Sequence, residues 1–331
     1  MKKKTAQWLL APLCALPAVG LVGCNGDNDS GGPTPNPTAT TAPTPSGSPA
    51  PDPTATPRGN VGRTIIGLTA NNEIVTFGSG SPGNVTLTRR ITGLQGLDQL
   101  VGLDYRPANR QLYALSRTRL YRFSSLGAGT VTPIGNPFTS PLTGTSFGVD
   151  FNPVPDRLRV VSENNQNLRI NPNTGALVDT NADVGGAQFD GTLAFADRDV
   201  NLGRNPNIVG AAYTNSVAGA TSTTNYVIDS SLDILATQGS RAGTSPAVSP
   251  NSGQLFTVGS LGIDLGDIVG FDIGTGQGDA FIAGNINSAS GGNSGGLSLL
   301  RVDLSNGRAT NLGRIGSSNS TLNLIGIAVQ P

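Results

Sequence analysis

The sequence predicts an all-β domain, a β-propeller of about five four-stranded blades. After residue 60, short runs of apolar and β-branched residues alternate with Gly, Asn, Pro and Ser, and no helical periodicity is evident. A short motif, an apolar residue followed by glycine, recurs along this part of the chain. The two ends of the domain also complement each other, as the ends of a closed ring must.

The recurring motif marks the first strand of each expected blade. It reads VGLDYRP, FGVDFNP, VGAAYTN, VGFDIGT and IGIAVQP, and its glycines are Gly102, Gly148, Gly210, Gly270 and Gly326. They lie 46, 62, 60 and 56 residues apart. A propeller blade usually takes about 40–50 residues, and the excess here falls in polar insertions.

Three further strands are expected after each motif. The first copy is followed by Gln111–Ser116, Arg119–Ser124 and Thr130–Gly135, and the second by Arg157–Ser162, Asn167–Asn171 and Gly175–Val178. A sixth blade follows if Thr180–Asn207 contains a degenerate repeat. A two-sheet β-sandwich is the alternative architecture.

The ends of the domain predict how the ring closes. Thr64–Ile91 matches Gln111–Ile134, so it supplies strands two to four of a blade that lacks its first strand. The chain ends in LIGIAVQP, which is a first strand with nothing after it. We therefore expect the C-terminal strand to join the N-terminal blade, because closure removes exposed sheet edges.

The first residues are typical of a lipoprotein signal peptide, expected over residues 1–23. Lys2–Lys4 precede the apolar stretch Trp8–Val22, which is too short for a comfortable bilayer span of about 20 apolar residues. Leu21–Cys24 resembles the lipobox of bacterial lipoproteins, in which the cysteine is acylated and becomes the first residue. We expect a membrane anchor at Cys24 and a place in the bacterial cell envelope, with Asn25 favouring the outer membrane.

Residues 24–60 form the predicted tether, and residues 61–331 the propeller domain. The tether is rich in Pro and Thr and has no apolar cluster, so it cannot bury enough surface to fold. Three of the 21 basic residues are Lys2–Lys4, which leaves 18 arginines against 21 acidic residues and a net charge of −3. This balance offers no electrostatic footprint for nucleic acid, and we expect a monomer.

The composition excludes several kinds of site. Histidine is absent, and of the two cysteines Cys14 lies within the signal peptide and Cys24 is the lipidation site. Histidine-based triads and metal sites, thiol catalysis and disulfides in the mature chain are thereby excluded. We predict no catalytic residue, and oxygen ligands are what remains.

One loop carries a calcium hypothesis. Asp179, Asn181 and Asp183 stand at alternate positions, and Asp190 follows at position twelve. Such oxygens can converge on Ca²⁺, which takes about six to eight hard ligands. Val184 at position six and the absence of flanking helices depart from an EF-hand, and an ordinary polar loop is the alternative.

Three aspartates form the second candidate. Asp104, Asp150 and Asp272 each follow a motif glycine by two residues, so in a propeller they would line the central channel. A ring of carboxylates could bind a cation, or shift the pKa of a neighbouring group toward catalytic use. We add Arg106 and Arg157 as candidate channel residues. Arg159, Arg169, Tyr105, Phe151 and Tyr213 belong to the same hypothesis of a cluster for an anionic or sugar ligand. The alternative is structural: a repeated aspartate often accepts hydrogen bonds from backbone N–H groups, and the aromatics pack in the core.

Several of these stretches together resemble one family. The segments LVGLDYRPANRQLYALS, GTSFGVDFNPVPDRLRVVSENNQNLRINPNTGAL, IVGAAYTNS and TVGSLGIDL are similar to the bacterial domain-of-unknown-function family with serial number 4394. The resemblance covers residues 62–331 and implies an exported, propeller-like domain with no activity to transfer. Three functions remain open: a lipid-anchored binding module, a calcium-dependent hydrolase of the lactonase or esterase type, and a structural envelope protein.

Overall fold

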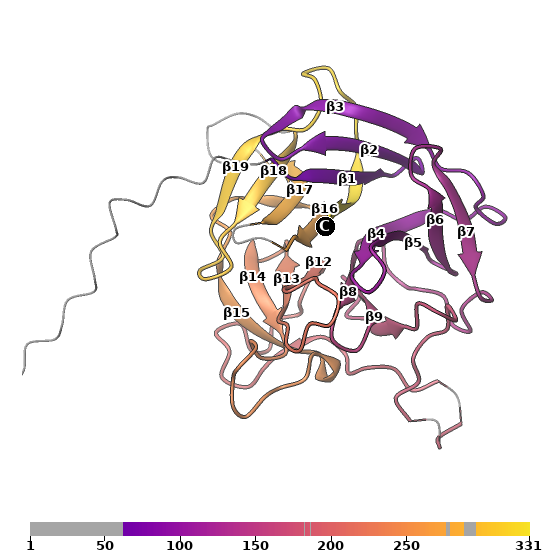
Figure 1. Ribbon diagram of the computed structural model, residues 1–331. Coiled ribbons are helices and arrows are strands. Elements are labelled where there is room, and N and C mark those ends of the chain that lie inside the picture. The colour runs from indigo at the N-terminus through magenta and orange to yellow at the C-terminus, as the bar shows by residue number, and fades with distance from the viewer. Residues whose placement is uncertain (1–61, 182, 186, 276–278, 288–295) are drawn as a thin grey trace, which may run out of the picture. The chain divides into compact units, whose positions relative to one another are not determined.

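The computed structural model describes residues 62–331 apart from 182, 186, 276–278 and 288–295. These residues form antiparallel sheets arranged as blades around a central axis (Figure 1). The only helix among them is a single 3₁₀ turn at Pro250–Ser252. No helix in the described part is long and apolar enough to cross a membrane. The predicted signal peptide, Cys24 and tether lie outside the described residues.

Five blades are present, each named here from its innermost strand outward. Blade one is β20 (Leu324–Val329), β1 (Thr64–Thr69), β2 (Glu73–Gly78) and β3 (Ser81–Arg90). Blade two is β4 (Leu100–Arg106), β5 (Gln111–Ser116), β6 (Leu120–Ser125) and β7 (Thr130–Ile134). Blade three is β8 (Phe147–Asn152), β9 (Arg157–Ser162) and β10 (Asn167–Ile170). Blade four is β12 (Ile208–Tyr213), β13 (Asn225–Asp229), β14 (Ile234–Gln238), β15 (Gln254–Ser260) and β11 (Ala194–Phe195). Blade five is β16 (Leu265–Ile273), β17 (Ala280–Ile286), β18 (Leu297–Val302) and β19 (Ala309–Arg314).

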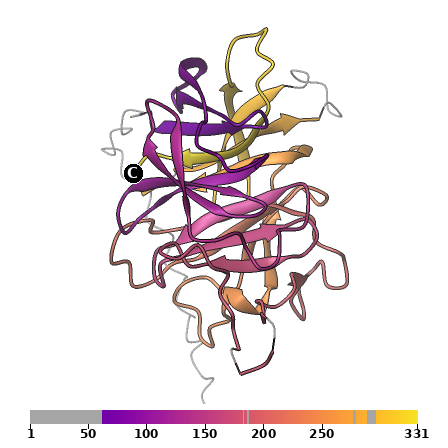
Figure 2. The same cartoon turned by 90° about the vertical axis from the view of Figure 1, so that its right-hand side faces the viewer.

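The five-bladed propeller predicted from the sequence is confirmed, and two details differ. Blade three has three strands, because the segment Gly175–Val178 makes only an isolated bridge, from Ile170 to Leu177. The stretch Thr180–Asn207 is not a sixth blade. Its one strand, β11, instead pairs in parallel with β15 at the outer edge of blade four. The strands within each blade are strongly twisted, as the side view shows (Figure 2).

The ring closes through its last strand, as predicted. β20 pairs with β1 in an antiparallel register that matches Val329 with Ile65 and Gly326 with Leu68. The C-terminal end of the chain therefore lies close to the middle of the ring (Figure 1). β20 also contacts the innermost strands β4 and β16 on either side, so it belongs to the ring as much as to its own blade.

Removing the closing strand should prevent folding. Leu324, Ile327 and Val329 are all buried, and each contributes about 1.5–3 kcal/mol on burial. Together with the lost pairing to β1, this is comparable with the whole stability of a domain, about 5–15 kcal/mol. A chain ending at residue 323 should lack the cooperative thermal unfolding of the full chain in circular dichroism. A chain shortened only by the exposed Pro331 should unfold like the original, and cooperative unfolding of the longer deletion would contradict the expectation.

Four of the five motif glycines, all except Gly326, are required by how closely the innermost strands approach each other. A Cβ atom added to Gly102 would lie 2.5 Å from Cγ2 of Val149, and one added to Gly148 would lie 2.5 Å from the backbone nitrogen of Ala211. On Gly270 it would lie 2.7 Å from the backbone carbon of Gly326. Each of these neighbours belongs to the innermost strand of the following blade. The recurring glycine thus marks the place where one blade meets the next.

The apolar core is divided among the junctions between blades. The cores between blades one and two, two and three, four and five, and five and one each draw buried side chains from both blades. At the junction of blades three and four the apolar cluster comes almost wholly from blade four and its flanking segments, with Val161 the contribution from β9. That junction contains a buried arginine in addition, described below.

Candidate functional site

The predicted aspartates meet in the central channel. Asp104, Asp150 and Asp272 lie on β4, β8 and β16, and they are only 6%, 1% and 4% exposed. Each offers a carboxylate oxygen within 4.8 Å of the others. Ala212 and Ala328 stand at the same position on β12 and β20. The structure therefore brings together the three residues that the repeat predicted to line the channel.

Each aspartate reaches across to the next blade. One oxygen of each accepts a hydrogen bond from a backbone N–H on the following innermost strand, and these bonds fasten β4 to β8, β8 to β12, and β16 to β20. The bonds run from Phe151 N to Asp104 Oδ2 (2.8 Å), from Tyr213 N to Asp150 Oδ1 (3.0 Å) and from Val329 N to Asp272 Oδ2 (2.5 Å).

The two blades that lack an aspartate are served by their neighbours. By the same pattern, the N–H groups of Tyr105 and Ile273 would point to the positions of Ala328 and Ala212. They donate instead to the aspartates beside them in sequence, Asp104 Oδ1 and Asp272 Oδ1, each at 2.6 Å. Five buried backbone N–H groups are thus satisfied by five of the six carboxylate oxygens. Buried N–H groups require such partners, so the aspartates are a structural part of the ring.

The remaining oxygen belongs to Asp150, whose carboxyl hydrogen-bonds with that of Asp272. Burial, followed by the charges of Asp104 and Asp272, raises the pKa of Asp150 well above its usual value. Burial likewise raises the pKa of Asp104 well above its usual value, and the charge of Asp272 adds to the rise. Burial raises the pKa of Asp272 to about 6, against the opposing effect of its hydrogen bonds. Both pKa values are raised, so the carboxyls of Asp150 and Asp272 share a proton.

The channel has little room around this cluster. A cavity of about 20 Å³ adjoins Asp104 and Asp272 at the mouth, and one of about 10 Å³ lies among the motif strands. The larger of these fits about one water molecule. A site for a small organic molecule usually measures about 300–1,000 Å³, so the interior of the ring has no space for a substrate of that size.

The two candidate arginines of the channel fasten a turn. Arg106 forms a double contact with the carboxylate of Asp156 through Nε and Nη2, and its Nη1 donates to the Tyr113 hydroxyl at 3.2 Å. Nη1 of Arg157 donates to the carbonyl of Pro155 at 3.2 Å and to that of Asp156 at 2.9 Å. Both guanidinium groups therefore hold the turn between β8 and β9, and neither contacts the aspartate cluster.

Two of the predicted calcium ligands, Asp179 and Asn181, accept hydrogen bonds from backbone N–H groups of their own loop. Oδ1 of Asp179 accepts from the N–H groups of Asn181 and Gln188, and Oδ1 of Asn181 accepts from the N–H of Asp183. Asp190 turns inward, with its side chain only 1% exposed. Among the described residues, the channel aspartates are the only three acidic side chains close enough to share a metal ion. The charge of Asp190 is compensated by two arginines, Arg159 and Arg169.

Arg159 is the centre of a polar network between blades three and four. It is 1% exposed and has partners from both blades and from the loops beside them. It donates to Tyr213 Oη (2.9 Å), Asp190 Oδ2 (2.7 Å), Asn167 Oδ1 (2.5 Å) and Asn251 Oδ1 (2.5 Å). The sequence suggested the arginines and Tyr213 as a group, but nothing in it indicated Asn251, which lies 92 residues from Arg159.

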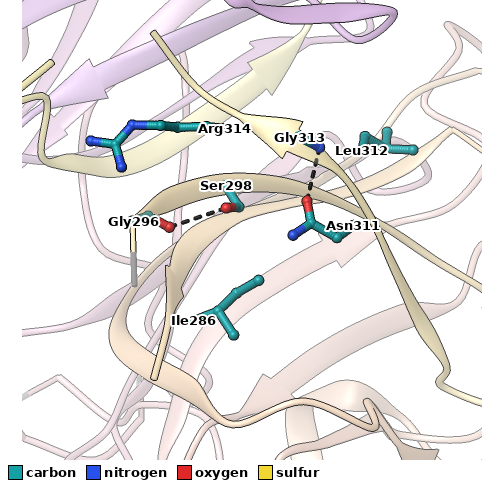
Figure 3. Close-up of a pocket in the computed structure, with 7 residues that line it drawn as sticks. All are labelled: Ile286, Gly296, Ser298, Asn311, Leu312, Gly313 and Arg314. Atoms are coloured by element: carbon teal, nitrogen blue, oxygen red, sulfur yellow. Dashed lines mark hydrogen bonds between the residues drawn. The ribbon is translucent and has the colours of Figure 1, made fainter. Parts of the chain in front are cut away.

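A hollow of about 500 Å³ lies on the outer strands of blade five, lined by Ile286, Gly296, Ser298, Asn311, Leu312, Gly313 and Arg314 (Figure 3). Its one charged lining residue, Arg314, donates to the carbonyls of Ser317 and Ser320 at 3.3 and 3.2 Å. Asn311 accepts from the N–H of Gly313 at 2.8 Å. The polar groups of this hollow thus support their own turns.

Comparison with solved structures finds several remote similarities. A structural genomics protein of unknown function from Bacteroides thetaiotaomicron is 16% identical, with a TM-score of 0.39, over 81% of this chain and 65% of the other. A chain of a nidogen/laminin complex is 12% identical, with a TM-score of 0.41, over 82% and 98%. The Dos1 propeller is 13% identical, with a TM-score of 0.38, over 77% and 61%.

These similarities are too remote to carry a function. No curated protein matches the chain. One family model does match, over residues 73–328, which is most of the propeller. The matched range includes the aspartate or alanine position of all five motif copies, the last of which is Ala328. The chain therefore belongs to the family described as domain of unknown function DUF4394.

Proposed function

We propose that this protein is a lipid-anchored propeller, displayed on the cell surface, that binds a ligand or partner. The observation that favours a binding module over an enzyme is the filled channel. Its three aspartates are engaged by backbone N–H groups, and the adjoining cavity of about 20 Å³ leaves no room for a substrate. Recognition then falls to the outer surface of the blades and their loops, as is usual when a rigid scaffold carries function on its loops.

The anchor follows from the sequence that precedes the domain. Leu21–Cys24 carries the small residue and the cysteine of a lipobox, after a charged and then an apolar segment. The Pro- and Thr-rich residues 25–60 would separate the propeller from the bilayer. At about 3.1 Å per residue, a fully extended polyproline II tether of this length reaches on the order of 110 Å.

The Cys24→Ser variant tests the anchor. It removes the only thiol that can accept the lipid after the signal peptide, so the protein should move from the membrane fraction to the soluble fraction of the envelope. The wild-type protein should be labelled by a radioactive fatty acid and the variant should not. Cys14→Ser is the matched control and should stay lipidated in the membrane. Membrane retention of the Cys24→Ser variant would contradict the proposal.

A calcium-dependent hydrolase is the second candidate, favoured by the proximity of the three channel carboxylates. A divalent cation there would have to replace the shared proton, and it would bind the folded protein only. Calcium at about 100 times its Kd would then raise the unfolding free energy by about 2.7 kcal/mol. We expect calorimetry of the full chain in detergent to give the same melting temperature with calcium and with EDTA. A calcium-dependent rise that Asp150→Asn abolishes would favour the metal site instead.

A further inference from the structure

A second hollow lies at the junction of blades three and four and measures about 580 Å³. It is lined by Arg169, Val178, Asp179, Thr180, Phe189, Asp190, Gly191, Asn251 and Ser252. It thus combines the end of the predicted calcium loop with residues of blades three and four. Its size suits a small molecule of the size of a sugar.

A buried group with excess positive charge adjoins this hollow, and two of its members, Arg169 and Asp190, line it. Arg159 and Arg169 share the single carboxylate of Asp190, at 2.7 and 2.8 Å. The side chains of Arg159 and Asp190 are each 1% exposed and that of Arg169 is 17% exposed. Two guanidinium groups on one carboxylate leave this group of three side chains with a net charge of about +1, which attracts an anion.

Two donors are held in position by this network. Arg169 binds Asp190 through Nε and Nη2, both at 2.8 Å, and no described residue accepts from its Nη1. Asn251 must turn its Oδ1 to Arg159, because a guanidinium can only donate. This fixes the amide orientation, and no described residue accepts from its Nδ2. Both groups line the hollow, and both are rigid because their other atoms are bonded to buried partners.

The rim of the hollow indicates the rest of the ligand. Asp179 would repel a bare inorganic anion, but its carboxylate can accept from hydroxyl groups. Thr180 and Ser252 add hydroxyls, and the half-buried ring of Phe189 offers an apolar surface. Donors for an anionic group, partners for hydroxyl groups and an apolar surface in one hollow together describe the binding of an acidic sugar.

We propose that this hollow binds an acidic sugar, with the sugar carboxylate accepting hydrogen bonds from Arg169 and Asn251. This names the ligand class of the proposed binding module and rests on that function. The carboxylate pairs with a guanidinium whose orientation Asp190 already fixes, so little side-chain entropy is lost on binding.

Isothermal titration of the full chain in detergent with D-galacturonate tests the proposal. Galactose, which lacks the carboxylate, and acetate, which lacks the ring, should each bind at least about tenfold more weakly, a difference of about 1.4 kcal/mol. Asn251→Asp keeps the acceptor for Arg159 but replaces the outward donor with an oxygen, so it should weaken galacturonate binding at least tenfold. Arg169→Gln should do the same while Arg159 still pairs with Asp190. Asn311→Asp, the same change on blade five, should bind like the wild type.

Three outcomes would overturn the proposal. The first is no heat of binding with galacturonate, the second is equal affinity for galactose or acetate, and the third is unchanged affinity in both Asn251→Asp and Arg169→Gln. Thermal unfolding of each variant shows whether it has folded. None of these outcomes bears on the anchor, because membrane retention of Cys24→Ser is measured separately.

Discussion

Gly148→Ala should destabilise the protein by about 3 kcal/mol or more. The new Cβ would lie 2.5 Å from the backbone nitrogen of Ala211 and 2.7 Å from the backbone carbon of Gly210. These are backbone atoms of the next blade, so no side chain can turn aside to make room. Overpacking in a tight core commonly costs about 1–3 kcal/mol, and here the whole of β8 or β12 would have to shift. Urea denaturation, with the free energy extrapolated to water, measures the loss.

The repeat supplies a matched control for this change. Gly326 stands at the same motif position on β20, but a Cβ there would lie 3.5 Å from Cα of Gly102, an ordinary contact distance. We expect Gly326→Ala to change the unfolding free energy far less than Gly148→Ala. Equal losses in the two variants would show that the glycine serves something other than the approach of adjacent strands.

Asp150→Asn should make the protein more stable above about pH 6, by about 1–3 kcal/mol. The asparagine keeps an oxygen for the N–H of Tyr213, and its amide donates to Asp272 without a titrating proton. Each unit by which folding raises the pKa of a carboxyl corresponds to about 1.4 kcal/mol of folding free energy at a pH above both the unfolded and the folded value. In the variant, an amide that is always neutral takes the place of a carboxyl that is neutral only when it carries a proton.

The sign of the pH dependence follows from the raised pKa values. In the unfolded chain these carboxyls titrate near pH 3.9. Folding raises the pKa of all three, that of Asp272 to about 6. The folded protein therefore holds protons that the unfolded chain has lost, and their contribution to stability is fully present below about pH 4. It is lost as the pH rises through about 6 for Asp272 and through the raised pKa values of Asp104 and Asp150.

Charged groups around the cluster do not reverse this expectation. None of the described ion pairs includes Asp104, Asp150 or Asp272. The adjacent Tyr105 is affected by the cluster, since burial and the charge of Asp104 raise its pKa to about 12.

Urea titrations at pH 5 and pH 8 measure the effect. The stability of the wild type should fall between these two values, and that of Asp150→Asn should fall less. Asp179→Asn, on an exposed loop, also removes one acidic side chain and should follow the wild type. Parallel behaviour of Asp150→Asn and the wild type would mean that Asp150 carries no proton in the folded protein.

The ring could be predicted from the sequence because its closest contacts repeat. At four of the five junctions between innermost strands a Cβ atom would lie within 3 Å of the next strand, and the motif glycine recurs in all five copies. The two ends of the domain match complementary parts of one repeat, and this match predicted the pairing of β20 with β1. The missing fourth strand of blade three could not be predicted, because Gly175–Val178 has the composition of a strand and only its neighbours decide whether it pairs.

The candidate sites, like the fold, could be predicted only where the repeat determines them. The repeat predicted where Asp104, Asp150 and Asp272 lie. The alternative given with that prediction, that a repeated aspartate accepts hydrogen bonds from backbone N–H groups, accounts for the bonds observed. The arrangement at Asp190 did not follow. An acidic residue in an Asn- and Asp-rich loop resembles a calcium ligand until Arg159 and Arg169 are brought beside it. Asn251 reaches that group from a distant part of the chain, and no local pattern marks it.

The closing strand also sets the order in which the molecule can form. During synthesis from the N-terminus, β1 emerges early, but its inner edge stays unpaired until β20 follows. Blades two to five can assemble in the meantime from neighbouring segments, whereas the last step joins the two most distant parts of the domain. Such a long-range pairing is slow, because the loop that it closes is the whole propeller. A chain held at any earlier point therefore presents a bare β edge to its surroundings, and only the completed chain is protected against association with others.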